Sequence, residues 1–385
     1  MRVLFTSTSG WGHIHPMVPL AQAFLNRGDE VMWATGDEVC GRLEREGIQT
    51  SVCGLDDGVA MSRFYQQFPE GRTIPPPRRP DYMFPRLFGT VCAPAMLADL
   101  MPVAQGWSPD LVVCDAAELA GPIVAGAVGA PNVTLGFGAL TPEPRVSAGG
   151  VEVAPLWAAH GLEPRPYGGL YDNLYLDIYP SSMQPTARAH VAATQALRPG
   201  AFATGEAEPL PDWVAAPSPD PLVYITLGTV FSNDEVLSTI VGAIGQLPVR
   251  VVVTVGPRGD PASLGSQPDN VHVARYIPQT QLLEHCATVV SHAGSGTFLA
   301  SLEARLPQLL VPQAADQFFN AAACAQAGAG IVLTQDGVSL EQVTEAVERL
   351  LSDASFVAAA TRISNEIAAM PSPHEVADHL HAQYG

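Results

Sequence analysis

Short apolar runs alternate with helix-like patterns along both halves of the chain. In the first half we predict buried strands at residues 3–7, 30–35, 110–115 and 132–137, and helices at 17–27 and 119–129. In the second half we predict strands at 222–227, 249–255, 271–273, 287–290, 309–312 and 331–333, and helices at 233–246, 297–304, 339–352, 354–369 and 373–383. This alternation predicts an α/β fold with parallel, doubly wound sheets.

Prolines crowd the middle of the chain. Six of them lie in residues 197–221, which predicts a semi-rigid linker between two units of similar size. Residues 57–90 and 141–183 lack a regular pattern, and we expect both segments to be irregular. The first is rich in aromatic residues, which are either ordinary packing residues or a mobile wall for an apolar ligand.

A turn of small residues, Ser291-His292-Ala293-Gly294-Ser295-Gly296, links a predicted strand to a predicted helix. The first N–H groups of such a helix have no partner within it, and with the helix dipole they form a site for an anion such as phosphate. His292 can add a hydrogen bond or a positive charge. The alternative is a tight turn that needs its glycines for backbone reasons only.

Charge argues against several classes of partner. The chain has 385 residues and a net charge of −19, with no basic run beyond Arg78-Arg79. Neither nucleic acid nor a membrane is therefore an expected partner. All 19 basic residues are arginine, which excludes a P-loop and lysine Schiff-base chemistry.

Cysteine usage and the N-terminal sequence indicate a reducing compartment. The six cysteines are scattered without a CxxC pair, and the apolar start is too short for a signal peptide. No apolar run approaches the length of a membrane span, so we expect a soluble, cytoplasmic protein. Both Gly10-x-Gly12 and Gly294-x-Gly296 lack the third glycine of a dinucleotide fingerprint, so NAD and FAD are not expected cofactors.

Several motifs follow one another in a fixed order. They are Gly12-His13-Ile14-His15-Pro16, Thr226-Leu227-Gly228-Thr229, Tyr276-Ile277-Pro278-Gln279, His292-Ala293-Gly294-Ser295-Gly296-Thr297, Pro307, Pro312 and Asp316-Gln317. In this order the chain resembles, end to end, the family 1 glycosyltransferases of the GT-B fold, in particular bacterial enzymes that glycosylate antibiotics such as enediynes and polyketides. The resemblance implies two Rossmann-like domains facing a central cleft. It places an acceptor-binding domain at 1–205, a linker at 206–220, a nucleotide-sugar-binding domain at 221–370, and a C-terminal helix at 371–385 that packs back on the first domain.

The resemblance also implies a donor site in the second domain. Its residues are Thr229, Tyr276, Ile277, Gln279, His292, Gly294, Ser295, Gly296, Thr297, Asp316 and Gln317. The glycine turn would hold the diphosphate, Tyr276 would stack on the base, and Asp316 with Gln317 would bind sugar hydroxyls. Fixed N–H donors favour the charge that develops on a diphosphate leaving group. No D-x-D motif is present, so we expect neither a metal nor any other cofactor besides the nucleotide-sugar co-substrate.

By the same resemblance, His13 is the general base and Asp115 is the carboxylate that orients it. Taken alone, His13 is as compatible with a loop histidine that caps backbone groups, and Asp115 with a helix N-cap. The residues expected to contact the acceptor are Trp11, Phe64, Tyr82, Phe84, Phe88 and Phe137. Direct displacement of the nucleotide implies inversion at the anomeric carbon.

Three positions depart from the family pattern, and one of them is Tyr276, which stands where the family usually has Trp and should keep the stacking role. Many members carry Glu eight residues after the histidine of the glycine turn to hold ribose hydroxyls, and Ala300 stands there. This favours a dTDP-sugar, with its deoxyribose, over a UDP-sugar. Arg305 replaces a frequent glycine, for which the sequence offers no account.

The expected function is transfer of a deoxysugar from dTDP to a hydroxyl of an apolar aglycone in antibiotic biosynthesis. The expected partners are therefore the small-molecule aglycone and the nucleotide sugar, bound by a monomer or homodimer. Three alternatives are a UDP-sugar-dependent transferase, a GT-B sugar-nucleotide epimerase, and a non-catalytic partner that binds a nucleotide sugar.

Overall fold

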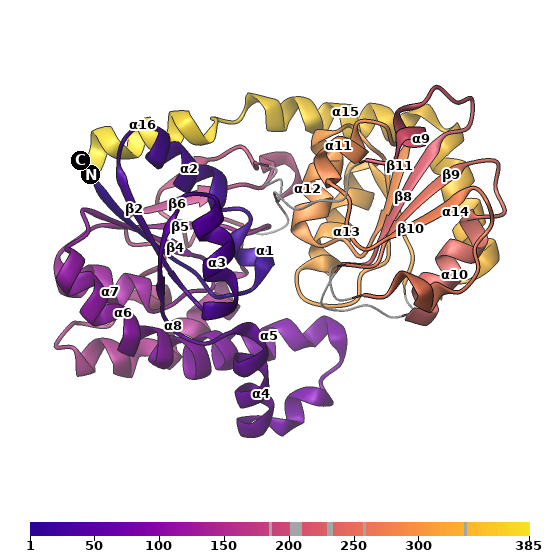
Figure 1. Cartoon of the computed structure of the whole chain (residues 1–385). Helices are drawn as coiled ribbons and strands as arrows, with labels where there is room; N and C mark the ends of the chain where they lie inside the picture. The colour runs from indigo at the N-terminus through magenta and orange to yellow at the C-terminus, as the bar shows by residue number, and fades with distance from the viewer. Residues whose placement is uncertain (185–186, 201–209, 229–233, 257–258, 335–336) are drawn as a thin grey trace. The chain divides into compact units, whose positions relative to one another are not determined.

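The computed structural model describes residues 1–184, 187–200, 210–228, 234–256, 259–334 and 337–385. Its backbone divides into two compact units. Unit 1 comprises residues 1–179, 184–202 and 370–385, and unit 2 comprises residues 180–183 and 203–369. Each unit has its own parallel sheet (Figure 1).

The sheet of unit 1 has seven strands in the order β3-β2-β1-β4-β5-β6-β7, and all neighbours are parallel. The strands are β1 (Arg2–Thr6), β2 (Glu30–Thr35), β3 (Gln49–Val52), β4 (Leu111–Asp115), β5 (Asn132–Leu135), β6 (Leu174–Asp177) and β7 (Thr194–Ala196). The strand order reverses between β1 and β4. In open α/β sheets ligands bind outside the carboxyl ends of the strands at such a reversal, which directs attention to β1 and β4.

Helices cover both faces of this sheet. They are α1 (Trp11–Ile14), α2 (Val18–Asn26), α3 (Asp37–Arg45), α4 (Asp57–Gln67), α5 (Arg79–Met83), α6 (Ala93–Trp107), α7 (Gly121–Val128), α8 (Glu143–Ala159) and α16 (Pro373–Tyr384). The shorter turns η1 (Pro69–Arg72), η2 (Pro76–Arg78) and η4 (Pro166–Gly169) are 3-10 helices, and η3 (Phe84–Cys92) is a π-helix.

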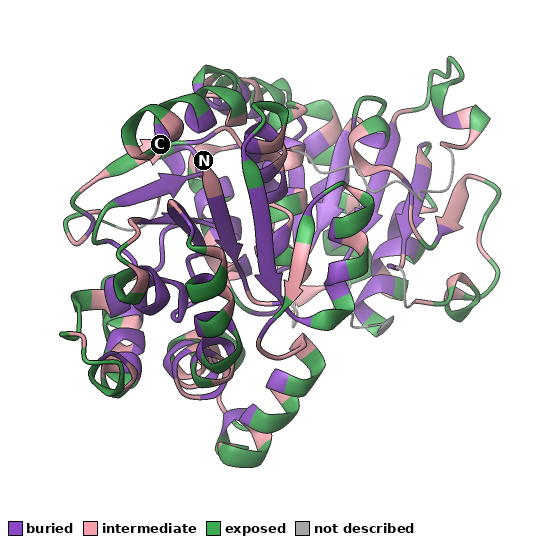
Figure 2. Ribbon diagram, turned by 60° about the vertical axis from the view of Figure 1, so that its left-hand side comes forward, coloured by how far each residue is buried: buried purple, intermediate pink, exposed green. Residues whose placement is uncertain are grey.

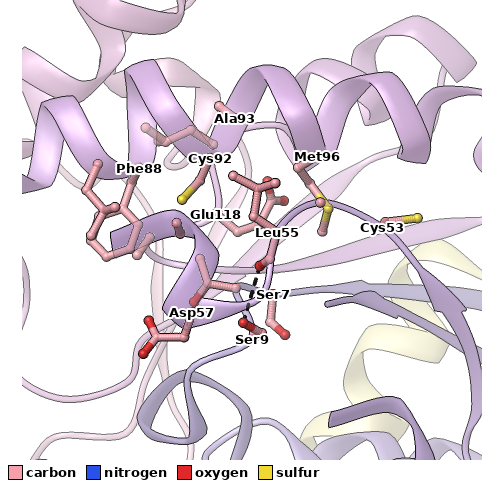
Figure 3. A pocket seen from close by; sticks show the side chains of 16 residues that line it. Ser7, Ser9, Cys53, Leu55, Asp57, Phe88, Cys92, Ala93, Met96 and Glu118 are labelled. Carbon is pink, nitrogen blue, oxygen red and sulfur yellow. Dashed lines mark hydrogen bonds between the residues drawn. The ribbon is translucent and has the colours of Figure 1, made fainter. Parts of the chain in front are cut away.

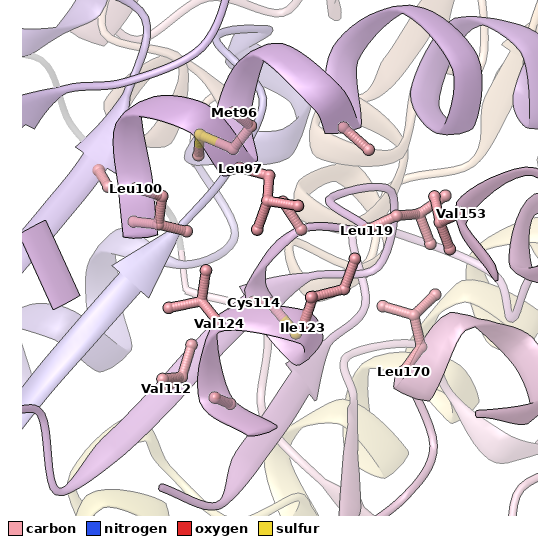
Figure 4. Packing of buried hydrophobic residues seen from close by; sticks show 14 of the residues in the cluster. Met96, Leu97, Leu100, Val112, Cys114, Leu119, Ile123, Val124, Val153 and Leu170 are labelled. Atoms are coloured by element: carbon pink, nitrogen blue, oxygen red, sulfur yellow. The ribbon is translucent and has the colours of Figure 1, made fainter. Parts of the chain in front are cut away.

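The core of unit 1 lies on both sides of its sheet. On one side, Val112 of β4 packs with Leu100 of α6 and Ile123 of α7 (Figure 4). On the other, Phe5 of β1 stacks on Trp33 of β2, with ring centroids 5.3 Å apart. Figure 2 shows the strands largely buried and the outer helix surfaces exposed. Burial on both faces explains why the central strands β1 and β4 are mostly apolar in the sequence.

The sheet of unit 2 has six parallel strands in the order β10-β9-β8-β11-β12-β13. The strands are β8 (Leu222–Thr226), β9 (Arg250–Thr254), β10 (Val271–Ala274), β11 (Thr288–Ser291), β12 (Gln308–Leu310) and β13 (Gly330–Val332). This is the strand order of a Rossmann fold, and it reverses between β8 and β11.

The helices of unit 2 are α9 (Asp212–Ala215), α10 (Asp234–Ile244), α11 (Gln279–Leu283), α12 (Ser295–Glu303), α13 (Gln317–Ala327), α14 (Leu340–Ser352) and α15 (Ala354–Ala369), with 3-10 turns η5 (Ser181–Met183) and η6 (Pro261–Leu264). Helix α14 begins at a capping serine, Ser339, whose hydroxyl accepts from the N–H of Gln342. Its buried positions Val343, Val347 and Leu350 recur at helical spacing and pack on the sheet core.

The predicted α/β fold class is confirmed, and each predicted strand begins and ends within two residues of its observed bounds. The prediction of irregular structure at 141–183 is wrong, because α8 occupies residues 143–159. The glycines that suggested a loop provide close packing instead. A Cβ at Gly150 would lie 2.6 Å from the backbone nitrogen of Gly168, and one at Gly149 would lie 3.0 Å from the ring of Phe84. Residues 57–90 are also mostly helical, in α4, α5 and η3.

The helical run at residues 76–107 is long and apolar enough to cross a membrane by length and composition, which the sequence reasoning did not anticipate. Half of its apolar window is buried in the structure. Leu97 and Leu100 belong to the core of unit 1, so packing within the unit accounts for the apolar character of this run.

The last helix, α16, belongs to unit 1. It begins with a capping box between Ser372 and Glu375, and it packs on α2. Beside it, the N–H of Arg198 donates to the carbonyl of Pro371 at 2.8 Å. The imidazole Nδ1 of His381 lies 3.0 Å from Oδ1 of Asp29, so polar contacts fix both ends of this segment to unit 1.

Candidate active site

His13 and Asp115 meet where the strand order of unit 1 reverses. His13 lies on α1, the first helix after β1, and Asp115 is the last residue of β4. Nδ1 of His13 is 2.9 Å from Oδ2 of Asp115, and the Asp115 side chain is only 1% exposed. The carboxylate beside Nδ1 favours a proton on that nitrogen, which leaves Nε2 as the basic nitrogen.

Two aromatic rings of unit 1 contact the His13 imidazole. The His13 ring centroid lies 4.5 Å from that of Phe137 and 5.7 Å from that of Phe88. Phe84 in turn packs edge-on against Phe88 at 5.3 Å. Three of the six predicted acceptor residues therefore gather at the histidine.

The other three predicted acceptor residues lie in different surroundings. Phe64 is fully buried in a small cluster with Tyr82, where its role is packing. The Tyr82 hydroxyl donates to Glu70. The Trp11 ring lies under the Arg42 guanidinium, 4.4 Å from it. Their aromatic character alone could not distinguish these positions from Phe88 and Phe137.

A pocket opens next to Phe88 at the same edge of the sheet (Figure 3). Its wall combines polar groups with apolar and sulfur-containing side chains, among them Ser7, Ser9, Leu55, Phe88, Met96 and Glu118. Burial raises the pKa of the Glu118 carboxyl to about 7, although hydrogen bonds to Thr6 and to the backbone oppose the shift. The sequence reasoning missed Glu118, which stands three residues after Asp115.

In unit 2, His292 lies at the equivalent reversal of strand order. Gly228 follows β8 and His292 follows β11. A Cβ at Gly228 would lie 2.7 Å from the imidazole, and one at Gly294 would lie 2.5 Å from its Nε2. The turn therefore needs these glycines to hold the histidine ring between them, and not for backbone reasons only.

The surroundings of His292 favour the uncharged form of its imidazole. Burial lowers its pKa from the usual value near 6.5, and the Asp316 carboxylate and a hydrogen bond with the Thr226 backbone oppose the shift only in part. The sequence allows His292 to contribute either a hydrogen bond or a positive charge to an anion site. The lowered pKa favours a hydrogen bond from the neutral ring.

Backbone donors converge beside this ring. Helix α12 begins after Gly294, and Phe298 is the first residue whose N–H bonds back to the Gly294 carbonyl, at 2.9 Å. The N–H groups of Ser295, Gly296 and Thr297 thus form the open first turn of the helix. Such a turn, with its positive dipole end, suits an anion.

A buried hydrogen-bond network ties this turn to the loop before α13. Ser295 Oγ donates to Asp316 Oδ2 at 2.6 Å. Asn320, fully buried, extends its Nδ2 toward the Ala293 carbonyl at 2.8 Å, Ser295 Oγ at 3.0 Å and Asp316 Oδ2 at 3.2 Å. Ala293 and Ala315 both have left-handed φ angles, 66° and 53°, so each loop contains one strained residue.

The remaining predicted donor residues differ in their surroundings. Gln279 joins the glycine turn, because its Nε2 donates to Thr297 Oγ1 at 3.0 Å. Gln317 uses its side-chain oxygen to accept from the N–H groups of Gln313 and Ala314, so it holds its own loop. Tyr276 is partly exposed after β10, and Ile277 is buried in the core beside it. Thr229 lies outside the described residues.

We expect Asn320→Asp to lower the free energy of unfolding by about 3 kcal/mol, because a buried carboxylate would face a carbonyl oxygen and the Asp316 carboxylate. Urea denaturation of the variant and the wild type measures this difference. Asn173→Asp is the matched control, because that exposed carboxamide makes one side-chain bond, to Asn132. Equal losses in the two variants would contradict the role of Asn320.

Within the parts of the chain that the structure describes, no group of three or more His, Cys, Asp or Glu side chains is placed to hold a metal ion. The reversal of strand order in unit 1 brings together the ion-paired imidazole of His13 and the Asp115 carboxylate. The reversal in unit 2 brings together backbone hydrogen-bond donors, the His292 imidazole and the Asp316 carboxylate. This chemistry suits an organic substrate and an anionic leaving group.

Known proteins share both the fold and the sequence. The chain is 33% identical to an L-demethylnoviosyl transferase of Streptomyces niveus, over 100% of this chain and 98% of that protein. The chain belongs to the antibiotic glycosyltransferases of the GT-B fold. It is also 31% identical to the elloramycin glycosyltransferase of Streptomyces olivaceus, over 100% of this chain and 98% of the relative. Residues 238–383 match the family described as erythromycin biosynthesis protein CIII-like, C-terminal domain.

Solved structures of glycosyltransferases resemble this one along its whole length. The spinosyn rhamnosyltransferase SpnG complexed with thymidine diphosphate has a TM-score of 0.84 and 28% identity, over 99% of this chain and 100% of that one. SnogD from Streptomyces nogalater has a TM-score of 0.81 and 28% identity, over 100% and 99% of the two chains.

The conformation at Arg305 explains why the resemblance predicts glycine at this position, and nothing in the structure explains the arginine. Arg305 follows the end of α12 and has a φ of 64°, in the left-handed region that glycine adopts without strain. We expect Arg305→Gly to raise the free energy of unfolding by about 1 kcal/mol, measured by urea denaturation. Arg305→Ala keeps the strain and should gain nothing. An equal gain in both variants would show that the arginine side chain is the cause.

Proposed function

We propose that this glycosyltransferase moves a deoxysugar from a dTDP-sugar to a hydroxyl of an apolar natural-product aglycone, with inversion at the anomeric carbon. The observation that carries the proposal is the His13–Asp115 pair, with Nδ1 fixed on the carboxylate at 2.9 Å. Nε2 would take the proton of the acceptor hydroxyl as its oxygen attacks the anomeric carbon. Asp115 would stabilise the imidazolium that forms.

The leaving nucleotide would be held in unit 2. The open first turn of α12 and the neutral His292 offer hydrogen bonds to the diphosphate, whose charge grows as the sugar departs. Asp316 Oδ2 is already bonded to Ser295 and Asn320. We therefore assign its other oxygen to sugar hydroxyls, and we assign Gln317 to support of its loop.

Two observations favour thymidine over uridine in the donor. Ala300 lies on α12 and offers no carboxylate for a ribose 2′-hydroxyl, which suits deoxyribose. Structures that resemble this chain were solved with thymidine diphosphate bound. Tyr276 and the Ile277 backbone would contact the base.

The aglycone would bind at the pocket beside Phe88, with Phe84 and Phe137 as further walls. In this structure the pocket encloses only about 30 Å³, room for about two waters. An aglycone therefore enters only when the side chains that line the pocket move. We also assign the protein to the cytoplasm, because all six cysteines are free.

Turnover of the purified chain tests the proposal. The protein is mixed with a dTDP-deoxysugar and a panel of polyketide aglycones, and products are identified by mass spectrometry and by the anomeric coupling in NMR spectra. The proposal predicts a glycoside of inverted configuration and equimolar dTDP. Transfer from UDP-sugars only, epimerisation of the donor without acceptor, or no activity of the chain alone would each contradict it.

A further inference from the structure

Glu118 is a buried carboxyl at the edge of the unit 1 sheet where His13 and Asp115 meet. Its side chain is 3% exposed and lines the pocket beside Phe88 (Figure 3). It lies in the turn that follows β4, three residues after Asp115. The mechanism described above does not use it.

The Glu118 carboxylate connects three elements. Oε2 accepts from the Thr6 hydroxyl at the end of β1 and from the N–H of Gly121 at the start of α7, both at 2.7 Å. Oε1 accepts from the N–H of Ala120, also at 2.7 Å. Gly121 leaves room for this arrangement, because a Cβ there would lie 2.7 Å from the Thr6 hydroxyl and 2.8 Å from Glu118 Oε2.

The same turn carries Asp115. The N–H of Glu118 donates to the Asp115 carbonyl at 2.8 Å, and the N–H of Ala117 donates to Asp115 Oδ1 at 3.2 Å. The Asp115 carboxylate is therefore oriented by a turn whose far end Glu118 fixes to β1 and α7. His13 follows β1, so Glu118 joins the two segments that must meet for the pair to form.

We propose that Glu118 is a positioning residue for the His13–Asp115 pair, acting by tying the turn after β4 to the end of β1. This inference rests on the proposed function, because it assigns Glu118 a role in the same reaction. Removing one of its hydrogen bonds loosens Asp115 relative to His13 and weakens the preference for the Nδ1-protonated imidazole.

Among the residues that the structure describes, no cation acts on Glu118. The titratable groups that interact with it are Asp115 at the end of β4 and the thiols of Cys53, Cys92 and Cys114. Burial raises the pKa of each thiol, so all three are neutral. Hydrogen bonds from Thr6, Ala120 and Gly121 are thus what holds the carboxylate, and a variant that removes one of them is a clean probe.

Thr6→Val and Thr6→Ser form the decisive matched pair, because valine removes the hydroxyl at nearly constant shape and serine keeps it. Nitrogen-15 NMR of histidine-labelled protein measures the tautomer and pKa of His13. We expect Thr6→Val and Glu118→Gln to lower the Nδ1-protonated fraction and shift the pKa toward that of Asp115→Asn, whereas Thr6→Ser matches the wild type. Glu375→Gln, a helix-cap glutamate of α16, is the control.

Activity supplies the second readout. We expect kcat in Thr6→Val to fall about tenfold, with the KM for the donor unchanged, and kcat in Thr6→Ser to be preserved. An unchanged His13 tautomer in folded Thr6→Val would overturn the proposal, even if kcat fell. If the wild type lacks turnover, the proposed function fails while the NMR comparison still decides the role of Glu118.

Discussion

His13→Ala is expected to lower kcat for an alcohol acceptor by about a thousandfold, the range that general base catalysis contributes. Binding of dTDP should be unchanged, because the donor residues lie in unit 2 and His13 lies in unit 1. Initial rates of glycoside formation give kcat, and calorimetric titration gives the dTDP affinity. We expect the loss of kcat because Nδ1 of His13 lies 2.9 Å from the Asp115 carboxylate, so that Nε2 is the nitrogen that can receive the proton.

Asp115→Asn tests the contribution of the orienting carboxylate while the base, His13, stays in place. Its carboxamide can present a donor to Nδ1 and favour the wrong tautomer, so we expect kcat to fall about a hundredfold or more. His160→Ala, at an exposed histidine just after α8, is the control and should keep full activity. Undiminished turnover in His13→Ala would exclude His13 as the base and return it to the role of a loop histidine.

Gly294→Ala is expected to weaken dTDP binding about a hundredfold. The new methyl group would lie 2.5 Å from Nε2 of His292, so the imidazole must leave its place between Gly228 and Gly294. Losing charge-assisted hydrogen bonds to the diphosphate costs about 1.5–3 kcal/mol each, which corresponds to this loss. Calorimetric titration measures the affinity directly.

Gly296→Ala provides the comparison within the same turn. A Cβ at Gly296 meets no atom within 4 Å, and alanine keeps the backbone N–H. We expect a much smaller loss of affinity than in Gly294→Ala. Equal losses in both variants would mean that the glycines serve the backbone of the turn and that the position of His292 is irrelevant to binding.

Much of the fold could be predicted from the sequence because its strands are buried on both faces. Runs such as 222–227 and 249–255 are mostly apolar, and each forms an inner strand of a parallel sheet. Helix α8 could not be predicted, because Gly149 and Gly150 resemble loop residues. Only the tertiary contacts with Phe84 and Gly168 show that these glycines make room for neighbouring segments.

The places of three candidate residues in the fold were predictable, because they lie near strand ends. Asp115 ends β4, His292 directly follows β11, and His13 lies on the first helix after β1, all beside a reversal of strand order. Glu118 and Asn320 were missed, although each stands three or four residues after a predicted site residue. Their importance lies in buried hydrogen bonds to other segments, which no local pattern reveals. Six aromatic residues were predicted to contact the acceptor, and three of them gather at His13. The sequence could not separate these three from the others, since Phe64 and Phe88 differ in burial and not in type.

Calorimetric titration of the purified protein with dTDP and with UDP, repeated on His292→Ala, tests whether the glycine turn of unit 2 binds the donor diphosphate. We expect tight binding of dTDP, weaker binding of UDP, and loss of both in the variant. Equal binding of the two nucleotides would remove the argument from Ala300 for a deoxyribose donor. Binding of neither nucleotide to the wild type would contradict the assignment of the glycine turn as a diphosphate site.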